Sequence, residues 1–242
     1  MDIPTRGDLE SFDCRVTMII RMRLTILVTM LVTLASAGSW AQDTGAMRKK
    51  ASAGDAAAQF ELAQYYVNEA RTARNDKRAL RDFNRAVEWY TKSAEKGFAQ
   101  AQFELGHLYI LGRGVEQDRD RGVNWQIEAA EQGLPEAQLE IGLRYLSGAI
   151  LEHDLELALD MLHKAAEQRY LPAVKQLGTM YFQAVGVEKD LVLAYQWFSI
   201  AAANDDKAAA GYLPILESIM DETQIDEARA LAAQWQADHM GE

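Results

Sequence analysis

The four histidines are the residues of this 242-residue chain most able to bind a metal ion or to move a proton. They stand at His107, His153, His163 and His239, and no two of them have the i, i+4 spacing that places two ligands on one helix face. The chain's one cysteine, Cys14, lies far from them in the sequence. We therefore expect no metal site, and surface or packing roles for the histidines.

The segment Gly112-Arg113-Gly114 resembles the start of a phosphate-binding loop. It lacks the rest of that fingerprint and a preceding strand, so we interpret it as a turn between helices. No acid, base and nucleophile are grouped in the sequence as catalysis would require. The sequence predicts no catalytic residues and no cofactor.

The elements that would have to position any functional residue are repeats of 36 residues. Residues 97–132, 133–168 and 169–204 align with one another, a longer copy precedes them at 54–96, and a weaker copy follows at 205–242. Such a period predicts a helical solenoid, in which each unit buries its apolar face against its neighbours.

Three columns of the aligned repeats lie four, eight and twelve residues past each start, which places them on one side of a helix. We expect this stripe to be buried. The columns are Ala58, Ala101, Ala137, Ala173 and Ala209; then Leu62, Leu105, Ile141, Leu177 and Leu213; then Tyr66, Tyr109, Tyr145 and Tyr181.

Glycine and aspartate mark other fixed positions of the repeat. Glycines recur inside each first helix (Gly106, Gly142, Gly178), where they predict close approach of a partner backbone. Aspartates are expected to cap the second helices (Asp118, Asp154, Asp190, Asp226). Gly97 and Gly133 suit the left-handed turn that ends a helix, whereas Arg169 and Asp205 in the later copies put the same turn in doubt. Trp89, Trp125 and Trp197 share one column, which favours packing over ligand stacking.

The run G-x-x-x-A-Q-x-x-L-G-x-x-Y-x-x-G-x-G-V-x-x-D, followed by A-x-x-W and A-A-x-x-G, resembles the Sel-1-like repeat, a relative of the tetratricopeptide repeat. The resemblance covers residues 54–204 well and 205–240 poorly. It implies an all-α fold, a right-handed α/α superhelical solenoid of about five helix-pair repeats: four at 54–96, 97–132, 133–168 and 169–204, and a degenerate capping repeat at 205–242. It also implies assembly of protein complexes, often in bacterial envelope signalling or secretion, and it transfers no catalytic residue.

The N-terminal part predicts export. Arg21-Met22-Arg23 precedes a 14-residue apolar run, Leu24 to Ala37, and small residues follow. These are the parts of a secretory signal peptide, and the run is shorter than a membrane span. We expect a signal peptide at 22–41 cleaved after Ala41, with Ala37 as the second choice and an uncleaved anchor as the alternative. Residues 1–21 would then be a mis-assigned or disordered extension, and 42–53 a lead-in to the first helix.

These features predict a periplasmic or secreted protein without a membrane span after cleavage, and we expect a monomer. The mature part would have no cysteine, unlike the cysteine-rich secreted branch of the same family. The net charge is −11, and residues 1–41 contribute equal numbers of acidic and basic residues. Nucleic acid and anionic lipid repel such a domain, so no nucleic-acid partner is expected.

The side of the first helices opposite the buried stripe is the predicted partner-binding surface. We call it the first-helix face. If first helices line the inner surface of the solenoid, these residues form ridges along a groove that suits a peptide. Glutamates would select a Lys or Arg of an envelope protein with a basic or amphipathic segment, and leucines would give apolar contact; the alternative is a solvated helix face. The face comprises Glu61, Gln64, Glu104, His107, Leu111, Glu140, Leu143 and Thr179.

The first repeat is seven residues longer than the others, and basic residues crowd its extra length. We expect the extra residues between its two helices. Arg74, Lys77 and Arg78 are candidates for contact with an acidic partner segment, and the alternative is a longer, solvated helix pair.

The function predicted from these patterns is a non-catalytic scaffold or adaptor for protein–protein interaction in the bacterial cell envelope. An alternative, by analogy with the cysteine-rich branch, is a cell-wall or β-lactam hydrolase, for which the sequence offers no grouped catalytic residues. A purely structural spacer is a third possibility.

Overall fold

The computed structural model describes residues 44–240, and the chain divides into two compact units, 1–54 and 55–242. In the first unit, residues 44–52 are helical. The predicted extension at 1–21, the signal peptide at 22–41 and Cys14 lie outside the described residues. No helix within residues 44–240 has the length and apolar character needed to cross a membrane.

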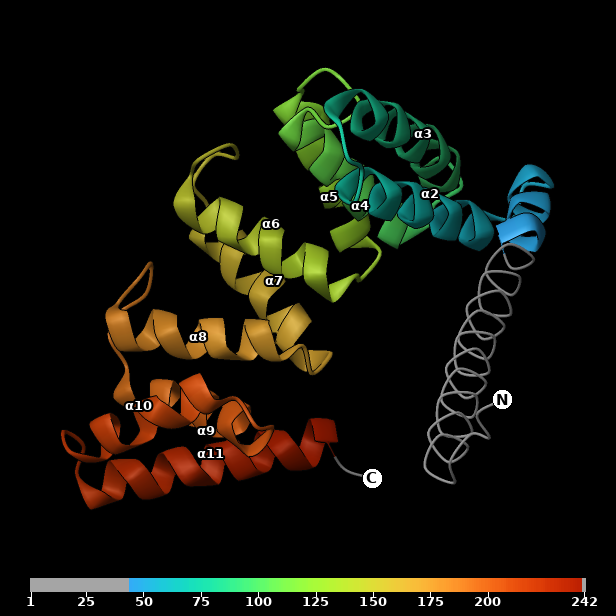
Figure 1. The fold of residues 1–242 in the computed structure, drawn as a ribbon. Coiled ribbons are helices and arrows are strands. Elements are labelled where there is room, and N and C mark those ends of the chain that lie inside the picture. The colour runs from blue at the N-terminus through green and yellow to red at the C-terminus, as the bar shows by residue number, and fades with distance from the viewer. Residues whose placement is uncertain (1–43, 241–242) are drawn as a thin grey trace, which may run out of the picture. The chain divides into compact units, whose positions relative to one another are not determined.

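The second unit is all α-helical, and its helices follow one another in pairs (Figure 1). Each helix of α2–α9 packs against the next one in the chain, and α10 and α11 both pack against α9. This arrangement confirms the predicted solenoid of helix pairs. The helices are α2 (Ala56–Arg71), α3 (Asp76–Ala94), α4 (Ala99–Leu111), α5 (Arg119–Glu131), α6 (Pro135–Ser147), α7 (Leu155–Glu167), α8 (Leu171–Gln183), α9 (Leu191–Ala203), α10 (Lys207–Glu217) and α11 (Glu222–Met240).

The predicted apolar stripe forms the core. All five alanines of the first column are buried, Leu62, Leu105, Ile141 and Leu177 are at most 1% exposed, and Leu213 is partly buried. Of the tyrosines, Tyr109 is buried, and Tyr66, Tyr145 and Tyr181 are half-buried. Burial of each leucine or isoleucine in the second column stabilises the fold by about 1.5–3 kcal/mol.

The helix starts follow the aspartate signal in three of four cases. The carboxylates of Asp118, Asp154 and Asp190 each accept a hydrogen bond from the backbone N–H three residues later, at about 3 Å. The prediction for Asp226 is wrong, because it lies inside α11. Asp221 takes the capping role instead: it accepts from the Gln224 N–H, and its own N–H donates to the Gln224 side chain.

The extra length of the first repeat lies within its helices and not, as expected, in a long connection. α2 has 16 residues and α3 has 19, whereas α4 to α9 have 13 each. Only residues 72–75 separate α2 from α3. Asn75 caps α3 by accepting from the Arg78 N–H at 2.9 Å, which lets the helix begin at Asp76.

The turn after each second helix keeps one geometry throughout. Gly97 and Gly133 have φ of 80° and 90°, and Arg169 and Asp205 adopt the same left-handed region with φ of 64° and 65°. The doubt about these two turns is therefore unfounded. Both residues adopt a backbone conformation that costs a non-glycine residue about 1–2 kcal/mol.

The predicted close approach at the helical glycines is present. A Cβ on Gly106 would lie 2.5 Å from the Gly122 carbonyl oxygen, and one on Gly142 would lie 3.1 Å from that of Ala158. Gly178 differs, because the nearest atoms are those of the Phe198 ring. The glycines let the paired helices come close at their crossing points.

Candidate partner-binding surfaces

The first-helix face is divided between exposed and half-buried side chains. Glu61 and Gln64 on α2 are exposed, and Leu111 at the end of α4 is 53% exposed. The remaining members, on α4, α6 and α8, are half-buried: Glu104, His107, Glu140, Leu143 and Thr179. The structure does not bring all eight residues into one contact set.

One polar contact joins the first-helix face across two repeats. His107 Nε2 on α4 lies 3.5 Å from Glu140 Oε1 on α6, and Arg144 one turn further along α6 lies 3.1 Å from Glu140 Oε2. The His107 ring also meets the Phe103 ring edge-on, with centroids 4.6 Å apart. The Glu140 carboxylate thus has a cation of its own chain beside it.

A hollow of about 300 Å³ lies where α4 meets α2 and α3. It brings together three predicted residues, Glu104, His107 and Leu111. Sequence reasoning missed its other lining residues, which come from α2, α3, α4 and the turn after α4: Val67, Arg71, Phe83, Leu108 and Arg113. Arg71 is the last residue of α2 and Arg113 lies in the turn after α4, and no periodicity points to their meeting.

Other members of the first-helix face lie outside this hollow. Thr179 Oγ1 donates to the carbonyl of Lys175 one turn earlier, at 3.0 Å. Gln64 and Glu61 are exposed along α2. Their predicted contact with a partner stays a prediction.

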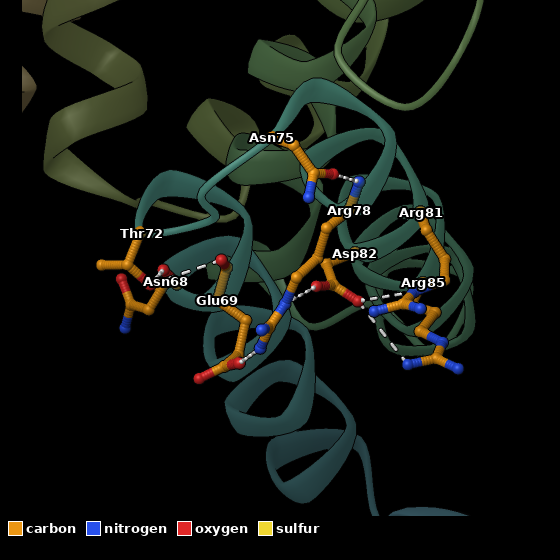
Figure 2. Close-up of polar contacts among 8 residues, drawn as sticks. All are labelled: Asn68, Glu69, Thr72, Asn75, Arg78, Arg81, Asp82 and Arg85. Atoms are coloured by element: carbon orange, nitrogen blue, oxygen red, sulfur yellow. Dashed lines mark hydrogen bonds and ion pairs between the residues drawn. The ribbon is translucent and has the colours of Figure 1, made fainter.

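The basic end of the first repeat is built around a buried carboxylate (Figure 2). Asp82 on α3 is 3% exposed. Its oxygens lie 3.6 Å from Arg78 Nε, 3.3 Å from Arg81 Nε and 3.6 Å from Arg85 Nη1. Arg78 also reaches Glu69 on α2, with Nη2 2.7 Å from Oε2. Arg78 therefore ties α2 to α3.

This geometry separates the three predicted basic residues. Arg78 is engaged within the protein, whereas Arg74 and Lys77 are exposed at the short connection and the first turn of α3. A hollow of about 540 Å³ adjoins Lys77 and is lined by Asn75, Lys77, Arg78 and Arg81. Sequence reasoning counted Asp82 only as a charge; its place one turn after Arg78 was the available signal for an internal pair.

A third hollow, of about 950 Å³, surrounds the turn between α4 and α5. Two of its charged residues already have structural roles: Asp118 caps α5, and the Arg121 guanidinium lies over the Tyr109 ring at 4.4 Å. Gly112 ends α4 in the left-handed conformation, so the Gly112-Arg113-Gly114 segment is the inter-helix turn that the sequence predicted.

A column of buried glutamines was missed at the sequence level, although glutamine follows the alanine of each early repeat. Gln59, Gln102 and Gln138 are each 4% exposed. Gln102 donates to the Ala94 carbonyl, and Gln138 donates to the Ala130 carbonyl at 3.3 Å. Each of these two bonds joins a first helix to the helix before it, so the role of the column is structural.

Three of the four histidines pack against aromatic rings, and His153 is exposed. His163 on α7 lies against Trp197, with centroids 5.5 Å apart, and burial lowers its pKa below the ordinary value, while Glu167 and Asp160 act in the opposite direction. His239 stacks on Trp235. Within residues 44–240, no three His, Cys, Asp or Glu side chains gather as a metal site would require.

These features define a helix-pair repeat protein with charged surfaces and a glycine-tightened core. The sequence pattern of the Sel1 repeat matches residues 56–98, 99–134, 135–170 and 172–206. The chain belongs to the Sel1 repeat family, whose members typically act as scaffolds for protein interactions.

Solved bacterial structures are similar to this chain. A Sel1 repeat protein from Oxalobacter formigenes is 26% identical, with 86% of this chain and 83% of that chain covered and a TM-score of 0.65. A protective antigen of uropathogenic Escherichia coli with an SLR fold is also 26% identical, with 80% of this chain and 56% of that chain covered and a TM-score of 0.44. No curated protein sequence matches the chain.

Proposed function

We propose that this protein is a non-catalytic adaptor of the bacterial cell envelope that binds a basic or amphipathic segment of another protein on its first-helix face. The hollow between α2, α3 and α4 carries the proposal. It is concave, it has the exposed apolar side chain of Leu111 at its margin, and it contains the carboxylate of Glu104. Such a combination suits a peptide side chain with an aliphatic stem and a cationic head.

The charges around the hollow limit the charge that the proposed partner segment can carry. Of the three glutamates of the first-helix face, only Glu140 is in an ion pair within the described residues. Glu61 and Glu104 are therefore the carboxylates available to a partner. Arg71 and Arg113 line the same hollow as Glu104 and would repel a run of cations. The proposed segment carries one Lys or Arg between apolar residues, not a polybasic run.

The test is capture of envelope proteins by the tagged full chain, compared with a Glu61→Lys, Glu104→Lys variant. A matched control, Glu88→Lys, Glu131→Lys, makes the same change of charge at exposed positions of the second helices α3 and α5. We expect a partner that the wild type and the control capture and that the first-helix variant loses. A partner captured equally by all three proteins would contradict the proposed surface.

The envelope location has its own test. We propose export by the signal peptide at 22–41, because its basic, apolar and small-residue parts stand in the order that the secretory pathway uses. N-terminal sequencing of the protein recovered from cells is expected to begin at Gln42. A chain that keeps residues 24–37 would indicate an anchor or an internal protein. Light scattering of the recovered protein tests the expected monomer.

A further inference from the structure

The start of α3 differs in charge from the rest of the solenoid. Residues 71–85 contain six basic residues and only two acidic ones, Asp76 and Asp82, whereas residues 86–242 contain 26 acidic and 12 basic residues. This segment is thus a positive region of a negative protein. Its field attracts acidic groups of another molecule and is screened over about 10 Å in 0.1 M salt.

Asp82 fixes part of this positive surface in place. Its carboxylate is buried, and the three arginines around it keep exposed side chains: Arg78 50%, Arg81 58% and Arg85 48%. The Asp82 carboxylate therefore orients three guanidinium groups. It balances one of their three positive charges, so two remain. Side chains held in this way lose less conformational entropy when a ligand binds.

Next to this cluster lies an apolar side chain that faces solvent. Leu80 is 57% exposed. Lys77, Leu80 and Arg81 are spaced i, i+3 and i+4 on α3, so they share one face of the helix. Arg74 precedes them in the connection, and within residues 44–240 neither Arg74 nor Lys77 is in an ion pair. We call Arg74, Lys77, Leu80 and Arg81 the α3 tip.

We propose that the α3 tip is a second docking surface, which binds an acidic segment of another protein with an apolar residue between its carboxylates. The cations of Lys77 and Arg81 flank Leu80 on the helix face, and the hollow of about 540 Å³ beside them gives the segment a concave seat. Arg78 supports the surface from within through Glu69 and Asp82. This surface is separate from the first-helix face and takes ligands of opposite charge.

An acidic protein segment fits this surface better than a membrane or a nucleic acid does. A bilayer presents a broad flat plane, whereas the α3 tip has a hollow beside Lys77 and Arg81 and offers one exposed leucine. The acidic excess of residues 86–242 would meet the negative field of a bilayer or a nucleic acid over a wide area. A short segment touches the α3 tip alone and avoids that repulsion.

The test uses the purified full chain and a labelled peptide, acetyl-(Glu-Glu-Leu)4-amide, with acetyl-(Lys-Lys-Leu)4-amide and acetyl-(Glu-Glu-Ser)4-amide for comparison. The tip variant is Arg74→Glu, Lys77→Glu, Arg81→Glu. The control variant, Arg119→Glu, Lys189→Glu, Lys207→Glu, changes the net charge equally at exposed positions elsewhere. Circular dichroism establishes that both variants keep the helix content of the wild type.

We expect the Glu-Leu peptide to bind the wild type and the control variant alike, to bind the tip variant at least about tenfold more weakly, and to be released by salt. Leu80→Ser is expected to weaken binding of the Glu-Leu peptide and to leave that of the Glu-Ser peptide unchanged. Absence of binding to the wild type, or an equal loss in the control variant, would overturn the proposal. So would a tip variant that keeps the peptide but loses retention on phosphatidylglycerol vesicles, because that result assigns the surface to a membrane.

Discussion

The helix pairs α4/α5 and α6/α7 have equal lengths and the same sequence register, yet they meet through different chemistry. In α4/α5, Gly106 and Gly122 face each other, and a Cβ on either would lie about 2.5 Å from the other's carbonyl oxygen. In α6/α7 the corresponding residues are Gly142 and Ala158, and the approach is 3.1 Å. One pair has two glycines at its crossing and the other has one.

The side chain beside each crossing differs as well. Gln126 of α5 is fully buried, and neither its amide nitrogen nor its amide oxygen has a partner within the described part of the chain. Leu162 stands at the same position of α7 and is also fully buried. Thus the repeat preserves a backbone arrangement while the residues that fill the crossing vary together. The residues at one position of the repeat should therefore be interpreted together with the residues they contact on the paired helix.

Substitution of the helical glycines is expected to give the largest difference in stability between the two pairs. Gly106→Ala is expected to destabilise the protein by about 2–3 kcal/mol, because the new methyl group meets a backbone carbonyl that cannot rotate away. Gly142→Ala is expected to change stability by less than about 1 kcal/mol, since the looser contact is offset by the helix propensity of alanine. Urea unfolding followed by circular dichroism measures both. Equal effects would mean that the two crossings are equally tight.

Exchange of the side chains at positions 126 and 162 tests the second difference between the two pairs. Gln126→Leu is expected to stabilise the protein by about 1–3 kcal/mol, because it removes two unpaired polar groups from the core. The reverse exchange, Leu162→Gln, is expected to destabilise it by a similar amount. The same unfolding experiment tests both. A loss of stability in Gln126→Leu would indicate that the amide has a partner, such as a buried water molecule.

The turns that end the two pairs offer a smaller contrast. The pair α4/α5 is followed by Gly133 and the pair α6/α7 by Arg169, both with positive φ. Arg169→Gly is expected to add about 1 kcal/mol of stability, and Gly133→Ala to remove about as much, because only glycine adopts this region without steric cost. Thermal melting is sensitive enough, at about 2–4 °C per kcal/mol for a chain of this size. An unchanged melting temperature in Arg169→Gly would show that the Arg169 side chain makes compensating contacts.

The smallest expected difference is a pH response that belongs to α6/α7. His163 on α7 has a lowered pKa owing to burial, and the corresponding residue of α5 is Ile127. The unfolded chain therefore binds a proton at a pH where the folded chain does not. This contribution to stability is fully present above the ordinary histidine pKa and is lost as the pH falls towards the folded value. Urea midpoints measured between about pH 5 and 7.5 should fall with acid less steeply in His163→Ile than in the wild type; equal slopes would contradict this assignment.

The fold could be predicted from the sequence because the same pattern of apolar residues recurs in each repeat. Leu105, Ile141 and Leu177 are apolar at one position, and only a helix that packs in the same way each time explains them. Asp118, Asp154 and Asp190 fixed the starts of second helices for the same reason. The predicted cap at Asp226 was wrong because α11, in the degenerate last repeat, begins at Glu222.

The candidate surfaces were less predictable because they depend on contacts between repeats. The Glu140–Arg144 pair follows helical spacing, but the contact of Glu140 with His107 depends on how α6 sits against α4. Arg78 was counted as a free cation, although Glu69 of α2 and Asp82 of α3 both hold it. The charge of a segment can be read from its sequence, but which charges remain available depends on the packing.

The packing of each helix against its successor has a consequence for how the chain folds. Since partners in the core lie within one or two repeat lengths of each other in sequence, contact order is low and loop closure costs little entropy. A helix pair can therefore form before later residues are present, and folding can nucleate in one pair and spread to its neighbours. The C-terminal helices differ from this pattern, because α10 and α11 both pack against α9. Folding of the C-terminal end thus waits for α9.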